Sequence, residues 1–288
     1  MERPKGYMDF GLYKKIIDEC SQYGKVDVML HMFGESLLHK DFIKMIRYGK
    51  QYPDIKLAFS TNATLLNKEY SKELIESGLD GIHLSLDGFT KETYESIRSG
   101  ADFDRTVGNI EKFLELHRQL GKPKPIIEIQ IIWTQQTRKE LQPFIKHWQE
   151  KARGTPAIIS VKEYSTWGGL VESQEIKKGI LCRVPCANIK YLLGIYWNGD
   201  VIPCCSDPEG YLKIGEIRNN TILSAWQGTT LQNFRQAHIK EEFHKFPFCN
   251  DCEGTHRYIT IPFIAGALKR QLYRFAGKRM EFLDIERK

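Results

Sequence analysis

Residues 9 to 164 alternate short β-branched apolar runs with longer stretches whose apolar positions recur every three or four residues. The first pattern predicts buried strands and the second predicts amphipathic helices, and their alternation is typical of βα units around a parallel sheet. Strands are expected at Val26–Phe33, Lys56–Thr61, Gly81–Leu86, Ile126–Trp133 and Ala157–Tyr164. Helices are expected at Phe10–Tyr23, Lys40–Tyr52, Lys68–Ser77, Phe103–Leu120 and Arg138–Lys151. Because the chain opens with a helix, it lacks the strand that a βα repeat places before one.

Composition and charge narrow the function classes only a little. With 288 residues, of which 41% are hydrophobic and 27% charged, the chain is long enough for one large domain and a small one. The net charge of +6 is spread along the chain, which argues against nucleic-acid binding. No apolar run approaches the roughly 20 residues of a membrane span, and the start lacks the apolar run of a signal peptide. We therefore expect a cytoplasmic protein.

The cysteines mark a chemically different part of the chain. Cys20 stands alone near the start, whereas the other six lie beyond residue 180: Cys182, Cys186, Cys204, Cys205, Cys249 and Cys252. In a cytoplasmic protein such a group indicates free thiols or metal ligands, because disulfides are kept reduced there. Buried structural cysteines would account for one or two of these positions but not for six.

Two features bring four of these sulfurs together. Cys186 and Cys204 flank a predicted hairpin whose Asn198-Gly199 pair suits a type I′ turn, and a hairpin closes its two ends onto each other. Cys249 and Cys252 form a knuckle in which two thiolates can face one metal centre. Four thiolates are the number that a cubane iron-sulfur cluster requires.

Other assignments of these cysteines remain open. Four thiolates also suit zinc, but structural zinc ribbons usually carry two Cys-X-X-Cys knuckles, and here one pair is split by a hairpin. A thioredoxin-like redox pair is disfavoured because the Cys249 knuckle does not start a helix that follows a strand. Cys205 adjoins Cys204, and neighbours on a strand point to opposite faces, so only one of the two is expected to bind. Cys182, four positions before Cys186, is the alternative to Cys186 as the first of the four ligands.

The cysteine spacing resembles a known domain. Cys186, twelve residues, Gly199, four residues and Cys204, followed by a Cys-X-X-Cys knuckle, are similar to the SPASM or twitch auxiliary domain of radical S-adenosylmethionine (SAM) enzymes. The full SPASM pattern has further cysteines after the knuckle, and none follows here. The resemblance therefore implies the single-cluster twitch version. Its auxiliary 4Fe-4S cluster would be bound by Cys186, Cys204, Cys249 and Cys252.

Three turns upstream resemble the SAM-binding loops of the same family. His31–His39 is similar to its Gly-Glu-Pro-Leu-Leu-His loop, with Phe33 in place of the first glycine and Ser36 in place of the proline. Ser60–Leu66 resembles its Thr-Asn-Gly-Thr-Leu-Leu strand end, and Ser85–Gly88 resembles its Ser-Leu-Asp-Gly turn. The resemblance implies that the first loop binds the SAM amino group and that the other two line the SAM pocket.

One arginine completes the implied SAM site. Arg98 matches the arginine found after the third turn, which is implied to pair with the methionyl carboxylate. The implied cofactor-binding residues are Gly34, Glu35, Ser60, Asn62, Ser85 and Arg98.

Each turn also has a purely structural interpretation. Glu35 could cap a helix that starts near His39, Asp87 could be an N-cap, and Asn62 could form an Asx-turn. Three such turns at successive strand ends, where a βα barrel has its site, together with the downstream cysteine pattern, favour the family.

The resemblance implies the architecture. It predicts an α/β fold, a partial (β/α)6 radical SAM barrel lacking its first strand, followed by a small α+β SPASM or twitch domain. The Tyr211–Ile217 and Ile222–Trp226 segments resemble the connecting strand and helix of that domain. The expected boundaries are residues 1–167 for the barrel, 168–180 for a linker, 181–258 for the cluster domain and 259–288 for a basic C-terminal helix or tail.

The implied activity depends on a motif that this chain does not contain. Radical SAM enzymes hold their catalytic cluster through Cys-X-X-X-Cys-X-X-Cys, so no catalytic residue is assigned here. Met1–Phe10 resembles the segment that follows that loop, and we expect the upstream reading frame to encode a strand and the three cysteines. The intact protein is then implied to cleave SAM reductively at a second, SAM-binding 4Fe-4S cluster and to take hydrogen from a peptide, sugar or other small molecule. An electron donor such as flavodoxin or ferredoxin is implied as a partner.

Two alternatives come from other function classes. The chain could be a non-catalytic iron-sulfur or zinc protein that transfers electrons or binds a partner. The tail Ile261–Lys288 combines basic and apolar residues, as do helices that lie on anionic lipid, although such a helix more often packs on its own domain.

Overall fold

A parallel sheet forms the centre of the larger part of the molecule. The computed structural model describes residues 2–168, 180–250 and 252–259. The five strands of the sheet lie in sequence order, β1-β2-β3-β4-β5, and every neighbouring pair is parallel. They are β1 (Val26–Met29), β2 (Ile55–Thr61), β3 (Gly81–Ser85), β4 (Ile126–Trp133) and β5 (Ala157–Glu163). This confirms the predicted α/β class, and within the described ranges β1 and β5 are the open edges of the sheet.

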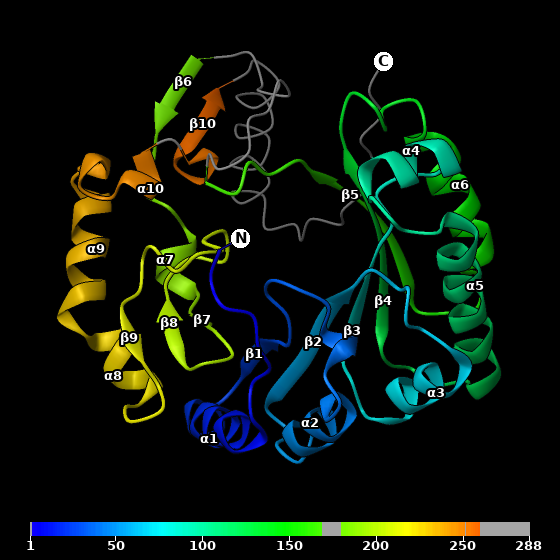
Figure 1. The fold of residues 1–288 in the computed structure, drawn as a ribbon, viewed down its shortest axis with the longest axis horizontal. Coiled ribbons are helices and arrows are strands. Elements are labelled where there is room, and N and C mark those ends of the chain that lie inside the picture. The colour runs from blue at the N-terminus through cyan, green and yellow to red at the C-terminus, as the bar shows by residue number, and fades with distance from the viewer. Residues whose placement is uncertain (1, 169–179, 251, 260–288) are drawn as a thin grey trace, which may run out of the picture.

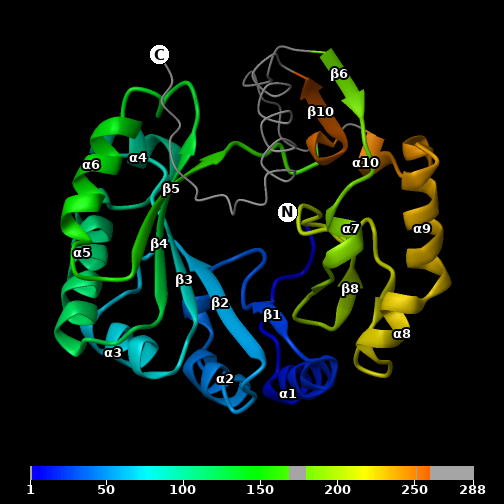
Figure 2. The ribbon, with the colours of Figure 1, turned by 180° about the vertical axis from the view of Figure 1, so that it is seen from behind.

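Helices follow the strands and cover one side of the sheet (Figures 1 and 2). They are α1 (Phe10–Cys20), α2 (Phe42–Gly49), α3 (Lys68–Glu76), α4 (Lys91–Ile97), α5 (Phe103–Leu120) and α6 (Leu141–Lys151), with short 3-10 turns η1 (Ser21–Tyr23) and η2 (Ser36–Leu38). The α4 helix was not predicted. Its one clear signal is Thr90, whose side chain accepts the amide hydrogen of Thr93 as an N-cap.

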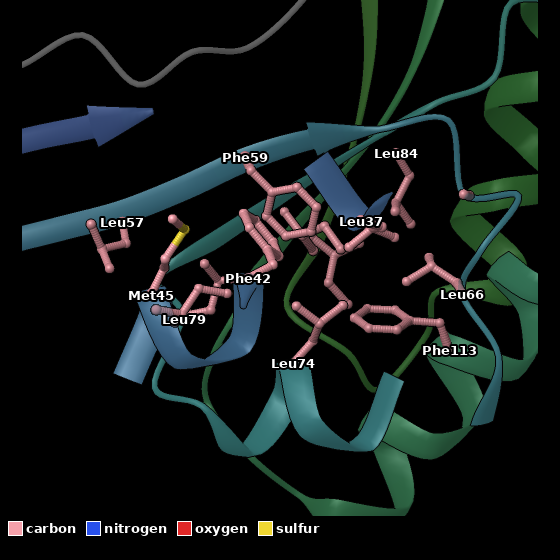
Figure 3. Packing of buried hydrophobic residues seen from close by; sticks show 14 of the residues in the cluster. Leu37, Phe42, Met45, Leu57, Phe59, Leu66, Leu74, Leu79, Leu84 and Phe113 are labelled. Atoms are coloured by element: carbon pink, nitrogen blue, oxygen red, sulfur yellow. The ribbon is translucent and has the colours of Figure 1, made fainter. Parts of the chain in front are cut away.

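The core lies between the sheet and these helices. Alternate residues along β2, β3 and β4 are fully buried, among them Phe59, Leu84 and Ile129. Figure 3 shows Phe59 of β2 packed beside Phe42 of α2, and their rings lie 4.8 Å apart, edge to face. Each such side chain stabilises the fold by about 1.5–3 kcal/mol through burial.

The other side chains of the same strands point away from the helices and are mostly polar. Because successive residues alternate, they form a second face of the sheet, which also carries Ala58, Ile126, Ile132 and Ile158. Its polar members are here called the polar face: Ser60, His83, Ser85, Glu128, Gln130, Ser160 and Lys162. None of its members is among the buried hydrophobic residues of the core. In Figure 1 this side of the sheet faces the rest of the chain.

The predicted strands match closely except the first. Four of them agree with β2 to β5 within one residue at each end, and β4 agrees at both ends. The prediction of Val26–Phe33 was wrong at its end, because β1 stops at Met29. One further bond joins the Leu30 amide to the Ala58 carbonyl at 2.7 Å, and the chain then turns, so that the Ser36 hydroxyl bonds the Leu30 carbonyl at 2.8 Å.

The cysteine region, defined as residues 180–250 and 252–259, consists of short elements. Its strands are β6 (Ile180–Arg183), β7 (Gly194–Ile195), β8 (Asp200–Ile202), β9 (Gly215–Glu216) and β10 (His256–Ile259). The last of these pairs with β6, and β7, β8 and β9 form a second antiparallel sheet. The helices are α7 (Asn188–Tyr191), α8 (Ile222–Gln227), α9 (Thr229–Ile239) and α10 (Pro247–Asn250), with η3 (Phe243–Lys245) and η4 (Glu253–Thr255).

The hairpin between β7 and β8 is confirmed, but its predicted turn type was wrong. A type I′ turn needs positive φ at both central residues, whereas only Gly199 has one, at 97°. The Gly199 amide bonds the Tyr196 carbonyl at 2.9 Å, so the turn ends at the glycine instead of containing it. The Asn198 side chain accepts the Asp200 amide hydrogen at 3.1 Å and stabilises this longer loop.

Polar contacts join the start of the chain to the cysteine region. The Lys15 ammonium donates to the carbonyls of Ile217 and Arg218 at 2.7 and 2.9 Å, and Arg218 pairs with Asp9 at 2.9 Å. The Arg3 guanidinium lies 3.7 Å from the centre of the Tyr196 ring. These contacts fix the cysteine region against the open β1 side of the sheet (Figure 2).

Some expectations cannot be compared with the structure. The described residues include no helix long and apolar enough to cross a membrane. Residues 169–179 of the predicted linker and residues 260–288 of the predicted tail lie outside the described part, as does Met1. The four domain boundaries therefore stay predictions.

Replacing Gly88 by alanine should destabilise the fold. A β-carbon there would lie 2.6 Å from the Tyr94 backbone nitrogen, so the α4 backbone would have to move, at a cost of about 1–3 kcal/mol. The matched control is Gly108→Ala, in the middle of α5, where the new methyl group meets nothing within 4 Å. That change should stabilise the helix by about 0.5–1 kcal/mol. Urea unfolding of both variants measures the difference, and equal stability would contradict the close approach at Gly88.

Candidate functional site

The Glu35 carboxylate joins the loop after β1 to the end of β2. Its Oε1 accepts hydrogen bonds from the Leu37 amide at 3.1 Å and the Thr61 hydroxyl at 2.8 Å, and its Oε2 accepts one from the Asn62 amide at 2.9 Å. Glu35 thereby caps η2, which begins at Ser36, whereas the structural interpretation expected it to cap a helix that starts near His39. The carboxylate is fixed in direction by three donors on two segments, and its position is set by tertiary contacts.

Two further groups shape the same loop. Gly34 has φ of 113°, and a β-carbon there would meet nothing within 4 Å, so its backbone lies open on that side. The His31 Nδ1 atom accepts the Ser60 amide hydrogen at 3.0 Å. Burial, together with the nearby His83, lowers the pKa of His31 to about 4. The imidazole is therefore neutral at pH 7 and serves as a hydrogen-bond acceptor that holds the loop after β1 to β2.

The second and third loops meet through serines. The hydroxyls of Ser60 and Ser85 lie 3.4 Å apart, and the Gln130 amide donates to Ser85 at 3.0 Å. The Asn62 side chain accepts hydrogens from the amide and hydroxyl of Thr64 at 3.0 and 2.7 Å, which is an Asx-turn. The Asx-turn that was one interpretation of Asn62 is therefore present. The backbone amide of Asn62 donates to the Glu35 carboxylate.

Arg98 lies against Asp87. Its Nε and Nη2 atoms donate to one carboxylate oxygen of Asp87, at 2.9 and 2.6 Å. The other oxygen of Asp87, Oδ1, is buried without a hydrogen-bond partner. The N-cap of α4 is Thr90, so the suggestion that Asp87 caps the following helix was wrong. The Asp87 to Arg98 pair instead ties the third loop to the end of α4.

The polar face carries a charged group that the sequence motifs do not predict. The Glu128 carboxylate lies 3.3 Å from the His83 Nδ1 atom and 2.7 Å from the Lys162 ammonium. Burial alone would raise the pKa of Glu128, but Lys162 and the other donors around it hold that pKa below its usual value. The available sequence signal was a pair of polar residues two positions apart in each of three strands: His83 and Ser85, Glu128 and Gln130, Ser160 and Lys162. The group lies one step along the sheet from Ser85 and Gln130.

The four predicted ligand cysteines lie together. A β-carbon on Gly254 would stand 3.3 Å from the Cys252 sulfur and 3.9 Å from the Cys186 sulfur, so both sulfurs lie beside that glycine. Burial raises the pKa of the Cys204 thiol to about 12, against the opposing effect of the Ser206 amide hydrogen bond, and the neighbouring charges of Cys205, Cys252 and Cys186 raise it further. Burial, followed by the charges of Cys252, Cys204 and Cys186, also raises the pKa of Cys249. Four thiols in a buried site suit a metal centre, whose positive charge compensates the negative charge of the thiolates.

The neighbouring cysteines differ from this set. The Cys205 sulfur accepts a hydrogen bond from the Asn188 side chain at 3.6 Å, whereas the Cys204 sulfur accepts one from the Ser206 amide at 3.4 Å. The backbone of Cys182 pairs with Arg257 within the β6 to β10 ladder, and its side chain lies outside the described part. Within the described ranges no three His, Cys, Asp or Glu side chains are arranged to hold a single metal ion.

Sequence comparisons identify both parts of the chain. The sequence profile of the radical SAM superfamily matches residues 1–120, and that of the SPASM iron-sulfur cluster-binding domain matches residues 186–253. The chain therefore contains a radical SAM region followed by a SPASM domain. The first match contains all three loops, and the second contains the four clustered cysteines.

Relatives of several activities share parts of the sequence. The tungsten-containing aldehyde ferredoxin oxidoreductase cofactor-modifying protein of Pyrococcus furiosus is 22% identical, over 87% of this chain and 80% of that protein. The AdoMet-dependent heme synthase of Methanosarcina barkeri is 33% identical over 38% of this chain. A GTP 3',8-cyclase of Clostridium botulinum is 33% identical over 35% of it. The chain covers only 31% and 32% of the lengths of these last two proteins.

Solved structures show the same fold. SuiB of Streptococcus suis, bound to its precursor peptide SuiA, superimposes with a TM-score of 0.66 at 16% identity, covering 88% of this chain and 66% of that one. The anSMEcpe enzyme with bound AdoMet gives 0.61 at 16% identity, covering 96% and 90%. BtrN with AdoMet and 2-DOIA gives 0.55 at 17% identity, covering 86% and 81%. The predicted radical SAM barrel with a SPASM domain is therefore confirmed.

The two domain matches imply the cofactors of this protein. Radical SAM and SPASM domains imply 4Fe-4S clusters and SAM, which confirms the predicted cofactors. The cysteine donor set fits this implication, since four thiolates from protein are what an auxiliary cubane needs.

Acidification should weaken the folded state through His31. Its pKa is about 4 when folded but about 6.5 when unfolded, so protons bind preferentially to the unfolded chain between these values. Stability is therefore fully present above pH 6.5 and is lost as the pH falls toward 4, by at most about 2 kcal/mol between pH 6.5 and 5. His31→Asn keeps an acceptor for Ser60 and should lose this part of the pH dependence. Urea unfolding at pH 7 and pH 5 measures it, and identical pH dependence in both proteins would contradict the assignment.

Proposed function

We propose that the intact protein cleaves SAM reductively and abstracts hydrogen from a polar peptide, sugar or other small molecule, with an auxiliary 4Fe-4S cluster in the cysteine region. One observation carries the proposal: Glu35, Asn62, Ser60 and Ser85 meet at the carboxyl ends of three adjacent parallel strands. That end of a βα barrel is where active sites are built. The chemistry supplied by SAM and a reducing cluster is a 5′-deoxyadenosyl radical that takes a hydrogen atom from the substrate.

Glu35 and Gly34 are proposed to bind the amino end of SAM. A carboxylate has about four acceptor positions, and three are used by Leu37, Thr61 and Asn62. The remaining position, on Oε2, is available to an ammonium group. The open backbone of Gly34 beside it allows a ligand to approach closely.

Ser60, Ser85 and Arg98 are proposed to line the rest of the SAM site. The paired serine hydroxyls offer donors and acceptors at the strand ends. The Nε and Nη2 atoms of Arg98 are engaged by Asp87, so the methionyl carboxylate is assigned to its Nη1 hydrogens. Asn62 acts through its turn, which presents its backbone amide to Glu35.

Cys186, Cys204, Cys249 and Cys252 are proposed to ligate the auxiliary cluster, with Cys182 as the substitute for Cys186. The sulfurs of Cys252 and Cys186 lie beside Gly254, and the charges of Cys252 and Cys186 act on the buried thiols of Cys204 and Cys249. A single zinc ion needs its sulfurs about 2.3 Å away, whereas a cubane binds each thiolate at a different iron atom. The hairpin that separates Cys186 from Cys204 supports a cluster over zinc, because structural zinc ribbons usually carry two Cys-X-X-Cys knuckles.

The polar face is proposed to contact the substrate. It adjoins the serine pair and offers the Glu128, His83 and Lys162 group together with the Gln130 amide. Binding an apolar substrate there would leave these groups without hydrogen bonds, which costs free energy. A substrate rich in hydroxyl, amide or charged groups is therefore favoured, and an electron donor such as flavodoxin or ferredoxin supplies the reducing electron.

The cluster ligands can be tested by single Cys→Ala changes and anaerobic reconstitution. Loss of Cys186, Cys204, Cys249 or Cys252 should abolish or sharply reduce iron and sulfide content, because a cubane needs four thiolates. Cys205→Ala is the matched control and should retain the wild-type content, since its sulfur is turned toward Asn188. Full iron content in the Cys186 variant, together with no iron in the Cys182 variant, would mean that Cys182 and not Cys186 is the first ligand.

SAM titration separates the enzyme from an electron carrier. With the three-cysteine segment present, the reconstituted protein should bind SAM and should bind it at least tenfold more weakly after Glu35→Ala. The Glu92→Ala change, in the first turn of α4, serves as the control. A protein that holds its cluster and ignores SAM would be a non-catalytic iron-sulfur protein.

A further inference from the structure

Two basic side chains hold the backbone on either side of the four cysteines. The Arg183 guanidinium donates through Nη1 to the Asn250 carbonyl at 2.7 Å and through Nη2 to the Cys249 carbonyl at 3.1 Å. From α9, the His238 Nδ1 atom accepts the Cys186 amide hydrogen at 3.3 Å. The hydrogen bonds of Arg183 thus fix the turn that carries one thiol, and that of His238 fixes the loop that carries another.

Arg183 is a partly buried cation with no anionic partner among the residues that the structure describes. It ends β6, and its guanidinium lies 4.2 Å from the centre of the buried Phe243 ring. Its Nε atom is buried and has no hydrogen-bond partner. Within the described ranges no carboxylate pairs with it, although burying an uncompensated charge is costly.

A negatively charged group at the cysteines would supply the missing compensation. A cluster with four thiolate ligands carries net negative charge, and Arg183 contacts the backbone of one ligand directly. One-electron reduction adds a further negative charge to the cluster and changes no covalent bond to the protein. A nearby cation favours that added charge, and it does so more strongly where little water screens it.

We propose that Arg183 is a positioning residue of the auxiliary site, which holds the Cys249–Asn250 turn and raises the reduction potential of the cluster by its positive charge. The proposal rests on the iron-sulfur function proposed above. Reduction potentials of such clusters depend on net charge, on hydrogen bonds and on solvent exposure, so a single nearby cation has a measurable effect.

The Arg235 side chain provides a matched control. It also lies over an aromatic ring, 4.0 Å from the centre of Trp226, and donates to two carbonyls, those of Ile189 at 2.9 Å and Trp226 at 3.2 Å. It differs in that neither carbonyl belongs to a cysteine. Removing it costs the same kinds of contact without removing charge from the Cys249 turn.

The experiment is an anaerobic redox titration of the reconstituted protein with dithionite, followed by the electron paramagnetic resonance signal of the reduced cluster. Arg183→Met should lower the ratio of reduced to oxidised cluster about tenfold at a fixed potential, which is 59 mV for one electron. Arg183→Lys keeps the charge and should stay near the wild-type potential. Arg235→Met should show the wild-type potential.

Several results would overturn the proposal. One is an unchanged potential in Arg183→Met with a full cluster, and another is an equal shift in the methionine and lysine variants, which would mean that the charge is not responsible. If the methionine variant takes up no iron, wild-type iron content in the lysine variant supports the role of the charge, and an equally empty lysine variant overturns it. A wild-type protein that takes up no iron would remove the proposed auxiliary cluster and this inference together.

Discussion

The hydrogen bonds accepted by Glu35 hold the functional end of the sheet together. Parallel strands place their carboxyl ends at one edge, but nothing in the sheet ladder itself fixes the loops that leave them. The Glu35 carboxylate does this by accepting hydrogens from its own loop and from Thr61 and Asn62 on the next strand. The His31 bond to Ser60 adds a second tie between the loop after β1 and β2. The SAM-binding role proposed for this loop depends on that fixed geometry.

Alternation along the strands divides the sheet into two environments. Residues such as Phe59 and Leu84 face the helices and form a dry core, and their immediate neighbours Ser60 and Ser85 face the other way. Hydrophobic burial on one side therefore stabilises a rigid support, on which polar groups can be held with little movement. The Glu128 group on this face has its charges paired within the protein, which keeps it organised before any ligand arrives.

Burial governs the protonation of the thiols in the cysteine region. Burial raises the pKa of Cys204 and Cys249, so without metal both sulfurs keep their protons at neutral pH. Under the proposed ligation, iron binding would displace those protons and would link the stability of the site to pH. The short elements around the sulfurs bury few apolar side chains of their own, in a small cluster that includes Leu231 and Phe234. A bound cluster would act as the cross-link of this region.

The sequence by itself determined the α/β class, the strands β2 to β5, the three loops and the four cysteines that belong together. These depend on local periodicity and on motif spacing, which a single chain displays directly. Only the tertiary structure decided that β1 ends at Met29, that Arg98 binds Asp87, and that His83, Glu128 and Lys162 form one group. Each of these depends on which side chains from distant segments meet. The same holds for Arg183 and Cys249, which are 66 residues apart and joined by one hydrogen bond that no sequence pattern encodes.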